Sequence, residues 1–513
     1  MNPLMPLFVV TPLAGAFLIM IIGRYFRNFS RYFASIILLI LVSFSIFSLA
    51  SPGNGLSLYK VGGWEPVNNI PIGIYMVMDG FTVIVLCIIS VIGFFAVFYS
   101  ISYIEKYTSP NYFYALFCLM IAGMNGIVLS GDIFNIFVFL EISVISAYAL
   151  VGFGVEKDEL EASFKYQVLG GVASFLILFG IGLIYWKTKT LNIADIKQAY
   201  SAGFDPAYYL FVQLLILSGF GLKAAIIPFH AWLPDAHSSA PSPISAMLSG
   251  VLIKVTGIYV ILRLFFNMFV ITNTMAVLIT ALGTLSMVIG VVLAIGQWDI
   301  KRLLAYHSIS QMGYVVMSAG IGMILVSEGR NPDIAALAIA GGIFHLVNHA
   351  VFKGLLFLNA GAIEYTTGTR DLRKMGGLAK YMPVTSATSF IASMSISGVP
   401  PFNGFFSKLI IIVAAILGKF YLLALLAVIV SIITLASFMK FQRYAFYNKP
   451  ASEVAPVAIR EVPFPMKFSL VFLSILCLVL SVLALPSLRD LLLTPAVNIL
   501  ADPAKYSLQL TGM

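Results

Sequence analysis

The sequence predicts an all-α polytopic membrane protein with about 14 transmembrane helices, some of them discontinuous. Sixty per cent of the 513 residues are hydrophobic, only 10% are charged, and the mean hydropathy is +1.00. A soluble domain carries about 25% charged residues, so the composition favours a chain surrounded by lipid. The formal net charge of +9 is typical of basic cytoplasmic loops. We therefore expect a multi-pass protein of the cell membrane with no nucleic-acid partner.

Long apolar segments define the helices, because about 20 mostly apolar residues are needed to span a bilayer. We expect helices at 3–23, 32–50, 79–101, 112–130, 132–153, 163–186, 208–227, 241–267, 274–297, 302–325, 334–358, 384–418 (interrupted), 420–445 and 466–486. The first segment lacks the basic start of a signal peptide, so we expect it to remain as a helix. The loop 51–78, rich in Gly, Pro and Asn, is expected to form a short hairpin outside the membrane.

The basic residues indicate which side each loop faces. If the loop with Arg24, Arg27 and Arg31 is cytoplasmic and the helices alternate, the cytoplasmic loops hold 17 of the 30 basic residues, the outer loops hold 9, and 4 lie within the membrane. This asymmetry predicts that both termini face outside. The basic residues between Lys187 and Lys197, on the outer side, count against it.

Two predicted helices are interrupted by Gly and Pro. The first interruption follows the helix at 208–227, and the second has the sequence ISGVPPFNGFFSK at 396–408. Interrupted helices at corresponding positions of two halves indicate an inverted repeat. We expect three N-terminal helices in 1–111, one five-helix repeat in 112–267, a second in 274–445, and a loop, last helix and tail in 446–513.

Glu141 and Lys223 are the first candidate functional residues. Glu141 lies nine residues after Asp132, which places it about 13 Å into a hydrocarbon core about 30 Å thick. A carboxylate there needs a cation or a proton, and Lys223 is the natural partner. A structural ion pair is the alternative, but buried pairs stabilise poorly compared with apolar packing, so we favour a functional pair.

Lys254 is predicted to lie in the middle of its helix, with no acidic residue within reach on that helix. Inserting a charge near the bilayer centre costs at least about 2.5–3.5 kcal/mol, and a buried lysine is suited to passing a proton. A lysine that extends to the membrane surface is the alternative, but the central position argues against it. We therefore expect Lys254 to take part in ion movement.

His345, His349 and Lys353 recur every four residues and therefore form one polar stripe on a helix. A histidine pair of this spacing could bind zinc, but no HExxH glutamate and no nearby cysteine supports a metal site. We favour a proton relay, because imidazole accepts and donates protons near neutral pH. The alternatives are histidines that only hydrogen-bond to neighbouring helices, and a Lys353 that lies close to the membrane surface.

Lys408 follows the second interruption and is predicted to lie near the midplane if its helix resumes at Asn403. His230 and His237 flank Pro-rich turns and could either admit protons or satisfy broken backbone; the sequence does not separate these roles. For the three acidic residues at predicted helix ends, capping is the simpler explanation. These are Asp79, Asp132 and Asp235.

The sequence carries no Gly-rich phosphate loop, Fe–S run or flavin motif. The three cysteines, Cys87, Cys118 and Cys477, lie in separate apolar segments without metal-binding spacing. We therefore predict no cofactor and no metal, and no catalysis by this chain alone.

Four stretches resemble a known family. They are PFHAWLPDAHSSAPSPISAMLSGVLIKVTGIY at 228–259, KRLLAYHSISQMGY at 301–314, HLVNHAVFKGLLFL at 345–358 and GVPPFNGFFSK at 398–408. They are similar to the antiporter-like membrane subunits of respiratory complex I, of Mrp-type cation/proton antiporters and of membrane-bound hydrogenases. The resemblance covers nearly the whole chain and implies fourteen helices with two inverted five-helix repeats.

The resemblance also implies roles for the candidate residues. Glu141 matches the glutamate of the fifth helix and Lys223 the lysine of the seventh, which modulate each other's proton affinity. Lys254 matches the central basic residue of the eighth helix, and His345 and His349 fall on the relay helix. Lys408 matches a twelfth-helix position that is lysine in some members and glutamate in others; lysine looks more like the D-type subunits of Mrp antiporters. A long lateral helix, found in the largest complex I subunit, is not expected.

We therefore expect a subunit of a multisubunit membrane complex that moves protons, with sodium as a second candidate ion. The complex would be either an Mrp-type antiporter or a redox-driven pump, in which partner subunits supply the energy. The first alternative is a stand-alone secondary carrier for an organic solute, since such carriers also have broken helices and midplane charges. The second is a scaffold that only holds a redox arm, which the cost of unneeded charge in the membrane disfavours.

Overall fold

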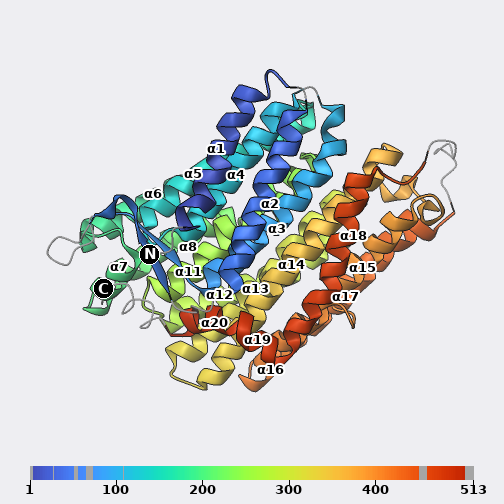
Figure 1. The fold of residues 1–513 in the computed structure, drawn as a ribbon. Helices are drawn as coiled ribbons and strands as arrows, with labels where there is room; N and C mark the ends of the chain where they lie inside the picture. Colours follow the sequence, from blue (N-terminus) through green and yellow to red (C-terminus); the bar gives the residue numbers. More distant parts are fainter. Residues whose placement is uncertain are drawn as a thin grey trace.

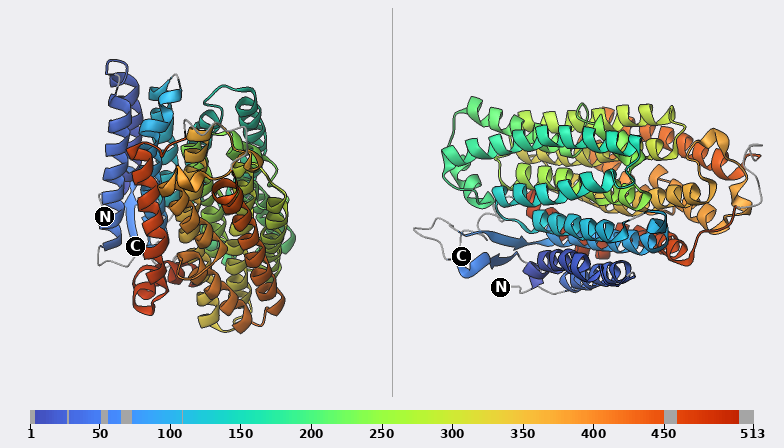
Figure 2. Two further views of the ribbon diagram at one scale, coloured as in Figure 1. Left: turned by 90° about the vertical axis from the view of Figure 1, so that its right-hand side faces the viewer. Right: turned by 90° about the horizontal axis from the view of Figure 1, so that it is seen from above.

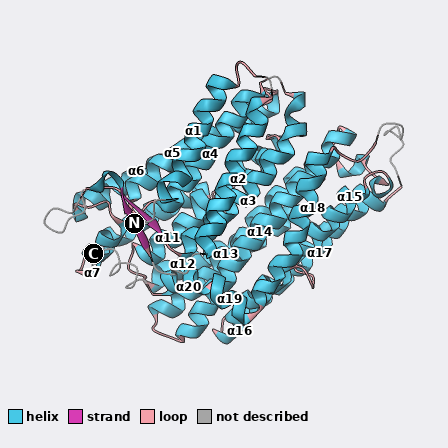
Figure 3. Ribbon diagram, viewed as in Figure 1, coloured by secondary structure: helices cyan, strands magenta, loops and turns pink. Residues whose placement is uncertain are grey.

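The computed structural model describes residues 4–26, 28–50, 56–64, 73–107, 109–449 and 459–502. These residues form one bundle of nearly parallel helices with a two-stranded hairpin at one end (Figures 1 and 3). In the view from above, α1 and α2 form an outer pair beside the larger group of helices (Figure 2). They pack against α4 and α3.

The α-helices are α1 (Leu4–Ile22), α2 (Phe29–Ala50), α3 (Gly80–Tyr103), α4 (Pro110–Leu129), α5 (Ile133–Val151), α6 (Lys157–Thr188), α7 (Ile193–Ser201), α8 (Pro206–Lys223), α9 (Trp232–Ser239), α10 (Ser242–Met247), α11 (Val260–Asn267), α12 (Asn273–Ile295), α13 (Ile300–Ser327), α14 (Pro332–Thr367), α15 (Pro383–Ser397), α16 (Asn403–Leu417), α17 (Tyr421–Gln442), α18 (Phe464–Val479), α19 (Pro486–Leu492) and α20 (Thr494–Ala501). Short 3₁₀ or π segments are η1 (Val61–Gly63), η2 (Ile104–Lys106), η3 (Leu248–Leu252), η4 (Lys254–Tyr259), η5 (Leu372–Lys374), η6 (Leu378–Lys380), η7 (Arg443–Tyr447) and η8 (Leu480–Ala484).

The predicted helices are confirmed. Within the described residues, 13 helices are long and apolar enough to cross a membrane, and the interrupted pair α15–α16 occupies the remaining predicted segment. The predicted hairpin is also confirmed, as β1 (Ser57–Lys60) pairs antiparallel with β2 (Tyr75–Met78).

The helix that follows the first interruption lies at the centre of the bundle. All residues from Ser242 to Asn267 are buried, so this segment has no face left for lipid. Its middle consists of the π-helical segments η3 and η4, whose wider turns leave carbonyl groups without their usual i+4 partner. The charge of Lys254 therefore lies inside protein.

The first interruption begins earlier than the sequence predicted. The expected helix 208–227 ends at Lys223, and α9 forms where the sequence indicated only a polar turn. Ala225 has a positive φ of 54°, which an α-helix cannot accommodate, so the chain turns there. Pro234 is compatible with α9 because it falls in its first turn, where backbone N–H groups need no helical partner.

The two interruptions share one backbone hydrogen-bond pattern. After α8, Ala225 and Ile226 donate to the carbonyls of Leu222 and Gly221. After α15, Gly398 and Val399 donate in the same way to Ser395 and Met394. The same pattern also follows α13 and α16 and is a common way for a helix to end, so the relation between 112–267 and 274–445 remains a prediction.

The helix pairs that open the two predicted repeats share a contact as well. Ser143 of α5 donates to the carbonyl of Met120 of α4 at 3.3 Å, and Ser310 of α13 donates to that of Met287 of α12 at 2.8 Å. In both pairs the partners lie 23 residues apart in the sequence. The contact recurs with the same spacing in both halves.

Candidate functional site

Four lysines from different helices are buried inside the bundle. Lys223, Lys254, Lys353 and Lys408 are each at most 2% exposed. Each donates hydrogen bonds to neutral oxygens, so the protein replaces the water that a charged ammonium group would otherwise require.

Glu141, Ser174 and Lys223 form the first part of the site. Lys223 Nζ lies 3.9 Å from Glu141 Oε1, which is too far for a direct hydrogen bond. The Ser174 hydroxyl lies between them: it donates to Glu141 Oε1 at 2.5 Å and accepts from Lys223 Nζ at 3.0 Å. Lys223 also donates to the carbonyl of Gly170 at 3.0 Å and to the Tyr148 hydroxyl at 3.4 Å. The predicted pair is therefore present, but a serine that the sequence did not indicate bridges it.

Lys254 is held by its own helix. Its Nζ donates to the carbonyls of Ser249 and Gly250 at 2.7 and 2.6 Å. The segment packs closely against the end of α8, since a Cβ on Gly257 would collide with Ala224 Cβ. Lys223 and Lys254 thus belong to elements in direct contact.

Helix α14, which carries the predicted relay histidines, also packs against this segment. A Cβ on Gly250 would lie 3.3 Å from the carbonyl oxygen of Ala350, the neighbour of His349. Both ring nitrogens of His349 are buried and have no hydrogen-bond partner among the described residues. Lys353 is fully buried and donates to the carbonyl of Leu304 at 2.5 Å. Burial in the protein does not give the depth of Lys353 in the membrane, so the alternative that it lies close to the membrane surface stays open.

His345 connects α14 to the second interruption. Its Nδ1 lies 2.9 Å from Ser407 Oγ, and its Nε2 lies 3.2 Å from Gln311 Oε1. Ser407 precedes Lys408, whose Nζ donates to the carbonyl of Ile396 at 2.8 Å and to Ser431 Oγ at 3.2 Å. The end of α15 thus supplies an open carbonyl to the lysine of α16.

Together these contacts place the six predicted residues along one series of touching elements. The order is Glu141 on α5, Lys223 on α8, Lys254 on η4, His349 and His345 on α14, and Lys408 on α16. Glu141 is at one end, with 31% of its side chain exposed. The other five are buried.

Two further histidines are buried near this series. His237 on α9 has no hydrogen-bond partner for either ring nitrogen among the described residues. Its ring lies 5.7 Å from that of Phe357 on α14, and both of its predicted roles stay open. His307 on α13 contacts Ser437 Oγ at 2.8 Å through Nε2. Sequence reasoning gave His307 no role, although it lies in a stretch that carries the family resemblance.

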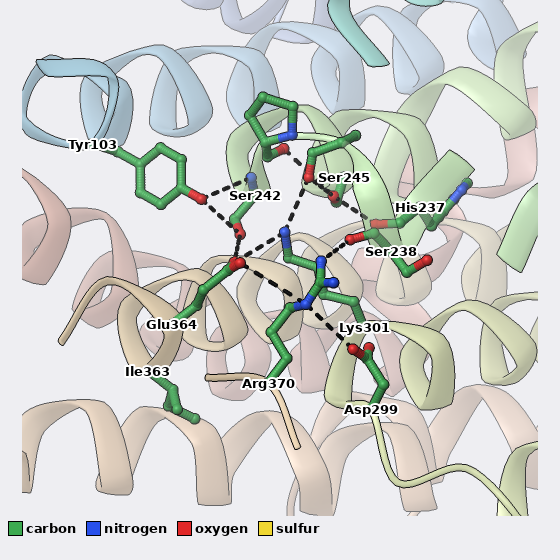
Figure 4. Close-up of polar contacts among 12 residues, drawn as sticks. Tyr103, His237, Ser238, Ser242, Ser245, Asp299, Lys301, Ile363, Glu364 and Arg370 are labelled. Carbon is green, nitrogen blue, oxygen red and sulfur yellow. Dashed lines mark hydrogen bonds and ion pairs between the residues drawn. The ribbon is translucent and has the colours of Figure 1, made fainter. Parts of the chain in front are cut away.

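A network of charged side chains lies at one end of the bundle, where α9, α10, α13 and α14 meet (Figure 4). Lys301 Nζ lies 3.1 Å from Glu364 Oε2 and donates to the carbonyl of Ala240 at 3.0 Å. Arg370 Nε lies 3.2 Å from Asp299 and 3.9 Å from Glu364. Lys301, which the sequence placed in a loop, is therefore buried at the start of α13.

Next to this network a cavity of about 260 Å³ opens at the surface. Asp235 on its wall lies within α9 and pairs with Arg302 at 2.6 Å and Lys165 at 3.1 Å. The prediction that Asp235 caps a helix is therefore wrong, because α9 starts before it. Asp79 and Asp132 do cap α3 and α5.

Asp79 has a second role that the sequence did not indicate. Its carboxylate accepts two hydrogen bonds from the Arg263 guanidinium, at 2.7 and 3.0 Å. Arg263, near the end of the predicted helix 241–267, is buried on α11. The pair joins α3 to the central helix.

Comparison with known proteins identifies relatives across the chain. Residues 130–434 match the family model described as NADH:quinone oxidoreductase/Mrp antiporter, and residues 64–114 match that of the N-terminus of chain 5 of NADH-ubiquinone oxidoreductase (complex I). A Na⁺/H⁺ antiporter subunit of Alkalihalophilus pseudofirmus, of the D type, is 38% identical over 400 residues, which is 77% of each chain.

Two solved structures are similar over 99% of both chains. One is a chain of the Mrp complex from Dietzia, with 27% identity and a TM-score of 0.86. The other is a chain of the membrane-bound sulfane sulfur reductase, an archaeal respiratory membrane complex, with 29% identity and a TM-score of 0.87.

Proposed function

The chain belongs to the NADH:quinone oxidoreductase/Mrp antiporter family, and on that premise we propose that it is an ion-translocating, antiporter-like subunit of a larger membrane complex. Protons are the ion that its side chains suit best, and sodium is the second candidate. Partner membrane subunits would surround it, as the similar chains come from multisubunit complexes.

The observation that carries the proposal is the series of buried basic side chains from Lys223 to Lys408. An ammonium group without a counter-ion is costly to bury, and each of these lysines is held by neutral carbonyls or hydroxyls. Such groups can accept and release protons, whereas a purely structural bundle would place apolar side chains at these positions.

The first step assigned to the chain's own residues is a change in the Glu141–Lys223 contact. At 3.9 Å the Coulomb energy between the two charges is about 4 kcal/mol at an effective dielectric constant of about 20. When Glu141 gains a proton, Lys223 loses this attraction and holds its own proton less tightly. The proton can then pass toward Lys254.

His349 and His345 are proposed to carry the proton from Lys254 toward Lys408. The two ring nitrogens of His349 have no hydrogen-bond partner within the described part of the chain, so the ring can take up a proton without first breaking a hydrogen bond. His345 contacts Ser407, the neighbour of Lys408. The roles of all six residues are proposals.

The test is transport by membranes that carry Lys254→Ala or Glu141→Gln in the intact complex. We expect both variants to lose most ion exchange at unchanged expression. Lys419→Ala, at an exposed turn, is the matched lysine control and should exchange ions like the wild type. Wild-type exchange in Lys254→Ala and Glu141→Gln would refute the proposal.

We also propose that both termini face outside, from the distribution of basic residues. Single cysteines in place of Lys187 and Lys374, which are both exposed, test this in whole cells. A membrane-impermeant maleimide should label the cysteine at 187 and leave that at 374 unlabelled. The reverse labelling pattern would show that both termini face the cytoplasm.

A further inference from the structure

A cavity of about 740 Å³ lies at the end of the bundle where α1 meets α2 and α3 meets α4, at the upper end in Figure 1. None of the six proposed translocation residues lines it. Its wall is formed by the turn after α1 and by η2, and it is rich in basic, amide and aromatic side chains. These include Arg24, Asn28, Arg31, Asn111, Tyr25 and Tyr114.

Arg31 gives the cavity an unused hydrogen-bond donor. Its Nη1 donates to Glu105 at 2.9 Å, and its Nη2 donates to Asn28. Its Nε is buried and has no partner among the described residues. A molecule in the cavity cannot reach this buried atom, but Nη1 and Nη2 each carry a second N–H group that can donate to an acceptor of a bound molecule.

The floor of the cavity is built by side chains that hold one another. Ser30 donates to Asn111 Oδ1 at 2.5 Å, and the Asn111 amide donates to the carbonyl of Gly23 at 2.8 Å. Gly23 has no room for a side chain, because a Cβ there would lie 2.6 Å from Ser30 Oγ. These contacts hold the floor of the cavity in place.

The net charge of the wall is positive. The wall carries two basic side chains, Arg24 and Arg31, and a single carboxylate, that of Glu105, whose side chain is 65% exposed. Arg24 is exposed and can turn toward the cavity. The expected ligand group is thus an anion with several oxygens, and guanidinium groups suit phosphate best.

The position of the cavity decides the source of that phosphate. It lies where four membrane-spanning helices end, the level at which lipid headgroups lie, and Tyr side chains are enriched at that level. Basic pockets between helices at this depth bind anionic headgroups. We propose that the cavity holds the phosphodiester of an anionic phospholipid, with Arg24 and the Nη atoms of Arg31 as donors.

The experiment is native mass spectrometry of the delipidated complex, titrated with phosphatidylglycerol. We expect Arg24→Gln and Arg31→Gln each to weaken retention of this lipid about fivefold, since each basic residue near a membrane surface contributes about that factor. Glu105→Gln should strengthen retention, because it removes the negative charge of the wall. Arg330→Gln, at the opposite end of the bundle, is the matched control and should leave retention unchanged.

Three results would overturn the proposal. One is retention of phosphatidylglycerol that is equal in all variants. The second is retention of phosphatidylcholine that equals that of phosphatidylglycerol, which would show that the negative charge of the lipid plays no role. The third is competition by an excess of inorganic phosphate, which would make the cavity a site for a soluble anion. Arg24→Gln keeps the test valid if Arg31→Gln fails to fold, because Arg24 is exposed at the surface.

Discussion

Ser174 couples the two charges at the start of the proposed ion path, because its hydroxyl accepts from Lys223 and donates to Glu141. A hydroxyl can rotate within its hydrogen bonds, whereas a direct ion pair would hold both charges in place. The contact can therefore form and break at a small cost, as ion movement requires.

We predict that Ser174→Ala slows ion exchange about tenfold, since hydrogen bonds to charged groups contribute about 1.5–3 kcal/mol. Proton-driven dye quenching in inverted vesicles measures this. Ser163→Ala is the matched control: Ser163 also joins α6 to α5, but it donates to the neutral carbonyl of Tyr148 at 2.8 Å. Equal rates in the two variants would remove Ser174 from the path.

The Asp79–Arg263 pair is a contact between single residues that stabilises the fold. Removing one partner of a buried pair costs about 3–5 kcal/mol, so Asp79→Ala should lower the thermal unfolding midpoint of the purified protein markedly. Glu328→Gln disrupts the exposed pair with Arg330 and should cost less than about 1 kcal/mol. Similar midpoints for the two variants would contradict the structural role.

At the scale of the element, the second interruption places Lys408. Gly398 has a φ of 77°, and a Cβ there would lie 3.0 Å from Lys408 Cδ. Gly368, after α14, has a φ of 71° with nothing within 4 Å of its Cβ position. The two glycines share one backbone conformation but differ in what lies beside them.

We therefore predict that Gly398→Ala and Gly368→Ala both lose about 1–2 kcal/mol of stability, the cost of a left-handed alanine. Only Gly398→Ala should also slow ion exchange, by about tenfold or more, because it displaces Lys408. Thermal unfolding and vesicle transport, measured on the same preparations, separate these effects. Slowed exchange in Gly368→Ala would show that backbone strain alone accounts for the loss.

At the scale of the whole molecule, the chain contains the proposed ion path. Its sequence reveals no group that could supply the energy for transport. Gentle purification of the tagged chain, followed by mass spectrometry, should therefore recover further membrane subunits. Companions with Fe–S or Ni–Fe motifs would make it part of a redox-driven pump, and small hydrophobic companions alone would make it part of a cation/proton antiporter. A chain that is recovered alone and transports an organic solute would overturn the proposed assembly.

The sequence by itself determined the helices and which of them carry a lysine in an apolar segment. A run of about 20 apolar residues must span the bilayer, and a lysine in its middle, such as Lys254, must be surrounded by protein or water instead of lipid. The interruption at 398–402 was also predictable, because Pro and Gly act on their own neighbours. These signals are all local, so they can be read without knowing which helices touch.

Only the tertiary structure decided which groups meet. Ser174 lies 33 residues from Glu141 and 49 from Lys223, and Arg263 lies 184 residues from Asp79. No periodicity within one helix specifies such contacts, because they depend on how helices distant in sequence pack. The π-helical turns that hold Lys254 have the same origin: the chain adopts them within a fully buried segment, where packing against α8 and α14 outweighs the local preference for an α-helix.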